Sequence, residues 1–131
     1  MKYLGIDYGT RRLGLAVSGE LDFSYPLAVI ENTETLLSDI EKICKDNKIE
    51  SIVIGESKDF AQNDNEIMTE VREFKAKLEE SLGLPVHLHP EFLTSMEAER
   101  LQGSNSLNDA SAAALILKSY LDTINNKNNN I

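Results

Sequence analysis

Three acidic residues stand where strands or helices are expected to end or begin, and their type suits metal chemistry. They are Asp7, Glu91 and Asp109. Carboxylate oxygens are the ligands that hard divalent cations such as Mg²⁺ prefer. Two such ions about 3.5–4 Å apart can activate water and stabilise the leaving oxygen in phosphodiester hydrolysis. If the three carboxylates converge in the folded chain, they form a site of this kind.

Each of the three residues also has a structural interpretation. Asp7 suits a turn in which its side chain accepts backbone hydrogen bonds. Glu91 suits a solvated loop, and Asp109 suits the capped first turn of a helix. In favour of chemistry, Gly5 and Gly9 flank Asp7 without side chains, so we expect them to leave room for a metal or a phosphate. The chemical interpretation requires that the fold bring the three carboxylates together, and the structural interpretation does not.

Strands are predicted in the first thirty residues by alternating apolar side chains. The predicted strands cover residues 2–8, 12–18 and about 26–31. Gly9 and Thr10 form a turn signal between the first two, which predicts an antiparallel hairpin.

After residue 31 the pattern alternates between helix and strand. Helices are predicted over residues 33–46, 67–82, 95–102 and 107 to about 124, and strands over residues 50–55 and 85–89. Strands joined through helices pair in parallel by right-handed crossovers. We therefore expect an α/β fold with a mixed five-stranded sheet, three strands antiparallel and two parallel, flanked by helices. Ligands of such sheets bind at the carboxyl ends of the parallel strands, where Asp7 and Glu91 would lie.

Composition indicates one soluble domain. The chain has 131 residues, of which 41% are hydrophobic and 27% are charged. We expect a domain over residues 1–124 and a flexible, asparagine-rich tail over residues 125–131. The start of the chain has no apolar signal segment and no apolar run is long enough to span a membrane, which predicts a cytoplasmic protein. Cys44, the only cysteine, falls on an apolar helical stripe and is expected in the core.

The net negative charge of the chain bears on whether it binds nucleic acid. The net charge of −9 weighs against tight, sequence-independent binding of nucleic acid, which depends on neutralising phosphates. Bound metal ions would reduce this conflict, because they carry positive charge to the substrate.

Four blocks of the sequence resemble the YqgF family. They are residues 5–16, residues 52–55, residues 91–95, and Asp109 with the apolar run that follows it to Leu121. Members of this family are described as Holliday junction resolvases and as nucleases that mature the 5′ end of pre-16S rRNA, with a ribonuclease H-like fold. The likeness extends from Lys2 to about Leu121, and its first block is the most specific.

The resemblance implies a metal-dependent endonuclease that uses two Mg²⁺ or Mn²⁺ ions. Its catalytic residues and metal ligands would be Asp7, Glu91 and Asp109. Its substrate-binding residues would be Thr10, Arg11 and Arg12, with Lys58 as a weaker candidate. The substrate would be structured RNA or branched DNA, with no membrane involved. The protein would be a monomer or a homodimer.

Two departures from the family pattern affect the expected site. The family usually has Asp-Glu-Arg where this chain has Pro90-Glu91-Phe92, so the cation beside the glutamate is missing. The segment after Gly55 is usually apolar in the family, and here it begins with Glu56, a fourth carboxylate that is either a substitute metal ligand or a sign that the site has drifted. His87 and His89 share one strand face, which suits either a metal site or a half-exposed strand.

Two other functions compete with the nuclease. A catalytically silent ribonuclease H-like protein that binds RNA, ribosome precursors or the transcription machinery would explain the acidic surface. The segment Asp7-Tyr8-Gly9-Thr10 also resembles the first phosphate loop of actin-like ATPases and sugar kinases, but those folds need two lobes and this chain has length for one.

Overall fold

The computed structural model describes residues 1–19, 23–57, 67–91 and 106–129. Its elements in chain order are β1 (Tyr3–Asp7), β2 (Arg12–Ser18), β3 (Ser24–Glu31), α1 (Leu36–Asp46), β4 (Ser51–Ser57), α2 (Ile67–Leu82), β5 (Val86–Glu91) and α4 (Ser106–Asn129). The helix predicted over residues 95–102 and the candidate Lys58 lie outside the described residues. None of the described helices combines the length and apolar character needed to cross a membrane.

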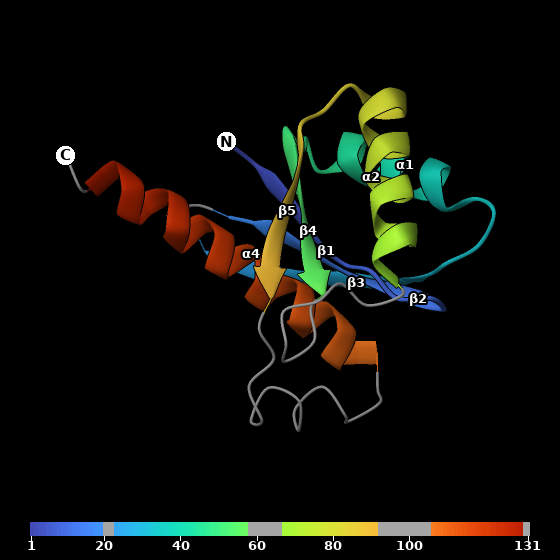
Figure 1. Ribbon diagram of the computed structural model, residues 1–131, viewed down its shortest axis with the longest axis horizontal. Coiled ribbons are helices and arrows are strands. Elements are labelled where there is room, and N and C mark those ends of the chain that lie inside the picture. Colours follow the sequence, from blue (N-terminus) through green and yellow to red (C-terminus); the bar gives the residue numbers. More distant parts are fainter. Residues whose placement is uncertain (20–22, 58–66, 92–105, 130–131) are drawn as a thin grey trace.

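The five strands form one mixed sheet in the order β3-β2-β1-β4-β5. The pairs β1–β2 and β2–β3 are antiparallel, and the pairs β1–β4 and β4–β5 are parallel. This is the arrangement that the sequence predicts. The carboxyl ends of β1, β4 and β5 therefore meet at one edge of the sheet. In Figure 1 the arrowheads of β4 and β5 point to the same end of the sheet, and the N-terminal part of α4 lies at that end.

Helices cover both faces of the sheet (Figure 1). Leu4 and Ile6 of β1 are fully buried in a core shared with α1 and α2. The opposite face packs against α4, and the buried hydrophobic cluster at this contact consists of Ala16 and Val53 from the sheet with Ala113, Ile116, Leu117 and Leu121 from α4. Because side chains alternate along a strand, Tyr3, Gly5 and Asp7 belong to the α4 face.

Helix α4 lies directly on β1 at Gly5. A Cβ added to Gly5 would come within 2.8 Å of the Leu117 Cβ and 3.0 Å of the Ala113 carbonyl oxygen. At Gly9 an added Cβ would come within 2.5 Å of the Arg12 carbonyl oxygen. The expectation that Gly5 leaves room for a metal or a phosphate is therefore wrong, because α4 fills the space beside it. Gly9 allows a close backbone approach on its Cβ side. It also lines an open hollow.

Three elements extend beyond their predicted ends. The ladder between β4 and β5 continues through the pairs Glu56–Pro90 and Ser57–Glu91, so both acidic residues lie within strands rather than in loops. The helix α4 runs to Asn129 instead of ending near residue 124. Helix propagation adds one hydrogen bond per residue, and asparagine opposes it only weakly.

Candidate active site

Asp7 is the last residue of β1 and is half-buried on the α4 face. The preceding residue, Ile6, pairs with Ile54 of β4, so Asp7 stands level with Gly55. Gly55 in turn pairs with His89 of β5. Because glycine has no side chain, β4 places nothing between Asp7 and β5 at this level of the α4 face.

Glu91 is the last residue of β5, at the same edge of the sheet. It follows His89 by two residues, and alternation along the strand assigns position 91 to the face of His87 and His89. The rings of both histidines contact Tyr120 of α4. Position 91 therefore belongs to the α4 face, as Asp7 does. Two strand spacings, about 10 Å, separate β1 from β5.

Asp109 lies in the first turn of α4. The direction of this helix follows from two contacts: Tyr120 packs on Tyr3 at the start of β1, and Ala113 lies over Gly5, further along the strand. Moving towards the helix N-terminus thus moves towards the carboxyl end of β1. Asp109 precedes Ala113 by one turn, or about 6 Å along the helix axis. Its backbone is therefore placed at the end of the sheet that also carries the other two acidic residues.

Position 56 belongs to the other face of the sheet. Ile52 and Ile54 of β4 are buried in the core shared with α1 and α2, and the pairing of β4 with β5 is regular through Ser57. Alternation assigns Glu56 to the face of these isoleucines. Positions 7 and 91 therefore share the face that α4 covers, and position 56 does not.

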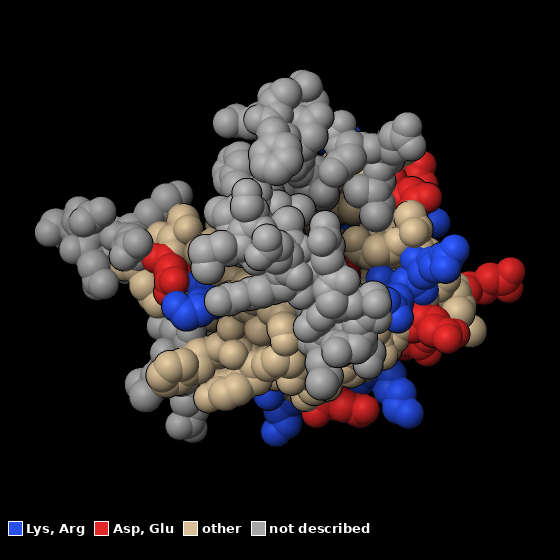
Figure 2. Space-filling model, turned by 90° about the horizontal axis from the view of Figure 1, so that it is seen from below, with Lys and Arg blue, Asp and Glu red and all other residues tan. Residues whose placement is uncertain are grey.

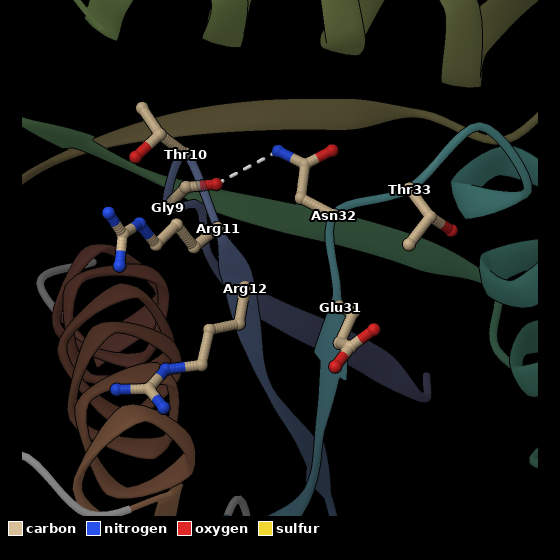
Figure 3. Close-up of a pocket in the computed structure, with 7 residues that line it drawn as sticks. All are labelled: Gly9, Thr10, Arg11, Arg12, Glu31, Asn32 and Thr33. Carbon is tan, nitrogen blue, oxygen red and sulfur yellow. Dashed lines mark hydrogen bonds between the residues drawn. The ribbon is translucent and has the colours of Figure 1, made fainter.

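An open hollow of about 700 Å³ lies beside this edge. Figure 3 shows the residues that line it, which are Gly9, Thr10, Arg11, Arg12, Glu31, Asn32 and Thr33. Both guanidinium groups point to the same side of the turn between β1 and β2 (Figure 3). The structure thus brings the predicted substrate-binding residues Thr10, Arg11 and Arg12 together in one concave surface.

The second wall of the hollow, Glu31 to Thr33, was missed by sequence reasoning. It follows from the hairpin register, in which Arg12 pairs with Glu31. The register puts the first residues after β3 beside the turn that precedes β2. The sequence carried a signal for this, because the antiparallel pairing of the second and third strands was predicted. No role was assigned to the residues that follow the third strand.

Charge on the surface is mixed rather than uniformly basic. Basic and acidic side chains alternate along the rim of the face that Figure 2 shows. Ion pairs between residues one helical turn apart join Lys45 to Glu41, Lys75 to Glu79 and Lys118 to Asp122. The described part of this face therefore offers no uniformly basic surface.

The histidine pair belongs to the packing of α4. The ring of His87 stacks on the ring of Tyr120, with 5.5 Å between the ring centroids. The ring of His89 meets Tyr120 edge-on, with 5.8 Å between the centroids. The Nε2 of His89 lies 2.9 Å from the Ser119 Oγ, and burial lowers the pKa of His89. These contacts support the structural interpretation of both histidines.

Cys44 is buried in the core, as predicted. Burial raises the pKa of its thiol to about 11, because the charged thiolate is disfavoured away from water. Among the described side chains, no three His, Cys, Asp or Glu residues gather in a way that could hold a metal ion. Asp7 is the one member of the expected triad whose side chain the structure describes.

Known proteins are similar to this chain in sequence or in fold. Proteins named "Putative pre-16S rRNA nuclease" from Maridesulfovibrio salexigens and Koribacter versatilis are 36% and 33% identical to it. Each alignment covers 92% of this chain, with 98% and 86% of the two relatives. Thermus thermophilus RuvC in complex with a Holliday junction substrate superposes with a TM-score of 0.58 at 17% identity over 94% of each chain.

The Fowlpox virus resolvase in complex with Holliday junction DNA gives a TM-score of 0.61 at 9% identity, over 95% of this chain and 99% of the resolvase. These two likenesses show the fold, which is the ribonuclease H-like fold of the RuvC-type resolvases. The family model described as "RuvX: Holliday junction resolvase" matches residues 1–123. Because that match spans almost the whole chain, this protein belongs to the RuvX family, also called YqgF.

Proposed function

We propose that this protein is a metal-dependent endonuclease that hydrolyses phosphodiester bonds in structured nucleic acid. Its first candidate substrate is the precursor of 16S rRNA, because relatives above 30% identity carry that name. A four-way DNA junction is the second, because the family model is described as a resolvase. RNA cleavage needs one active site, whereas symmetric junction cleavage calls for two and therefore for a homodimer. Either activity suits a cytoplasmic protein.

The observation that carries this proposal is the shared place of three acidic positions. Asp7 and Glu91 end two strands whose carboxyl ends meet at one edge, and both belong to the face that α4 covers. The first turn of α4, with Asp109, lies at the same end of the sheet. This common end of the sheet, beside a hollow lined by two arginines, supports a shared site for the three residues.

The donor set suits a hard cation, because all three residues offer carboxylate oxygens. Asp7, Glu91 and Asp109 would hold two Mg²⁺ or Mn²⁺ ions. When bound, these ions would supply an activated water and stabilise the leaving oxygen. Arg11 and Arg12 would bind phosphates that flank the cleaved bond, and Thr10 would donate a hydrogen bond to the same backbone. Positive charge from these groups would offset the net charge of −9 where the substrate approaches.

A cleavage panel tests the proposal. Labelled pre-16S rRNA fragments, a four-way DNA junction and plain duplexes are incubated with Mg²⁺ and with Mn²⁺. We expect metal-dependent cleavage of a structured substrate, and its loss in Asp7→Asn and Glu91→Gln. The matched control is Glu56→Gln, which removes a carboxylate outside the proposed triad and should cleave normally.

Two outcomes would contradict the proposal. If RNA binds but is not cleaved, and calorimetric titration finds no divalent ion bound, the protein is the catalytically silent binder that the missing arginine after Glu91 would suit. If Glu56→Gln abolishes cleavage while Glu91→Gln does not, the proposed triad is wrong and Glu56 replaces Glu91 in it.

A further inference from the structure

Asn32 ties the end of β3 to the turn that carries the two arginines. Its side-chain Nδ2 donates a hydrogen bond of 2.9 Å to the Gly9 carbonyl oxygen, drawn in Figure 3. Its backbone N–H donates a bond of the same length to the Arg11 carbonyl oxygen. These two bonds fall on either side of Thr10. One half-buried residue therefore holds both sides of the turn.

The backbone of the turn is closely packed at Gly9. The Cα of Gly9 lies against the Arg12 carbonyl oxygen, where a Cβ would not fit. Thr10, Arg11 and Arg12 are exposed and face the hollow. The position of their side chains therefore depends on the backbone beneath them, to which Asn32 is bonded.

We propose that Asn32 is a positioning residue for nucleic-acid binding, which holds the turn so that Arg11 and Arg12 present their guanidinium groups to one phosphate backbone. The inference rests on the proposed function and adds a residue that the resemblance did not assign. A flexible arginine turn would lose freedom when it binds, and a turn already held in place avoids that cost. An amide is required because the Gly9 carbonyl needs a donor.

The test measures affinity for a labelled RNA hairpin with a single-stranded 5′ extension, without divalent ions, over 50–200 mM salt. Asn32→Ala removes the bond to Gly9, and Asn32→Asp keeps the shape but loses the donor. We expect each variant to bind about fivefold more weakly, the effect of one lost hydrogen bond. In cleavage assays KM should rise while kcat stays within about twofold, because ground-state binding alone is affected. Asn47→Ala is the matched control, since the Asn47 Nδ2 donates a bond of the same 2.9 Å length to a backbone carbonyl, that of Ile43, and Asn47 does not line the hollow.

A double-mutant cycle separates positioning from a general effect on folding. If Asn32 acts through the arginines, Asn32→Ala should weaken binding no further when Arg11 and Arg12 are already alanine. A similar loss in both backgrounds would overturn the inference, as would wild-type affinity of Asn32→Ala and Asn32→Asp. Thermal unfolding of each variant fixes a temperature at which all are folded.

The same experiment distinguishes failure of this inference from failure of the proposed function. If the arginine variants bind RNA as the wild type does, the nucleic-acid site lies elsewhere and both proposals fail. If the arginine variants bind more weakly but the Asn32 variants do not, the proposed function stands and the positioning role falls.

Discussion

The carbonyl oxygen of Ala113 lies so close to Gly5 that a Cβ on residue 5 would come within 3.0 Å of it. The helix α4 thus lies against the backbone of β1 at Gly5, where the Leu117 side chain and the Ala113 carbonyl group occupy the space that a Cβ would need. Because this contact sets the position of the helix along the strand, it also sets where the first turn of α4 stands relative to Asp7. Gly5, which the sequence suggested would leave room for a metal, instead allows the close approach of α4 to β1.

Gly5→Ala should destabilise the protein by about 1–3 kcal/mol, because the added methyl group overpacks a close contact. Thermal and urea unfolding measure the loss, and Ser111→Ala, at an exposed position of α4, should leave stability unchanged. Divalent metal affinity should fall as well, since α4 must move away from β1. Wild-type stability of Gly5→Ala would show that the helix adjusts without cost.

Asp109→Asn should separate a metal ligand from a helix cap. Asparagine keeps a capping oxygen, so thermal stability without metal should stay near that of the wild type. A neutral amide holds a hard cation less well than a carboxylate, so Mg²⁺ or Mn²⁺ binding should weaken and cleavage should be lost. Asp109→Ala should also lower stability, by about 1 kcal/mol if the cap is real. Full metal affinity and cleavage in Asp109→Asn would leave Asp109 a cap and nothing more.

Glu31→Gln should strengthen the binding of RNA. Glu31 is an exposed carboxylate in the hollow that holds Arg11 and Arg12, and it repels any phosphate that enters. Removing the charge should raise affinity about twofold at 50 mM salt, with the gain fading at 200 mM because salt screens surface charges. Filter binding at both concentrations measures this. A loss of affinity would mean that phosphates do not enter the hollow.

His89 should make stability depend on pH. Burial lowers its pKa from the ordinary value of 6.5, so the unfolded chain takes up a proton at a higher pH than the folded chain does. The unfolded state then binds more protons, and the free energy of unfolding should fall as pH decreases through 6.5, levelling off below the folded pKa. Urea unfolding between pH 5 and 8 should show this slope, and His89→Gln should reduce it. An equal slope in His89→Gln would assign the effect to another group.

The sequence by itself determined the element types, the mixed sheet and the edge at which Asp7 and Glu91 end their strands. Those features follow from periodicity and turn residues, which act between neighbours in the chain. The hairpin around Gly9 and the core position of Cys44 are of the same kind. The resemblance of four sequence blocks to the YqgF family also indicated the family to which the chain belongs.

Only the tertiary structure decided which residues share a face and which backbone lies beside them. The extended ladder of β4 and β5 depends on pairing between two distant segments, and it assigns Glu56 and Glu91 to opposite faces. The occupant of the space at Gly5 is a helix more than a hundred residues further along the chain. The bond from Asn32 to Gly9 joins residues 23 positions apart. Local pattern cannot determine such contacts, because each depends on how whole elements pack against one another.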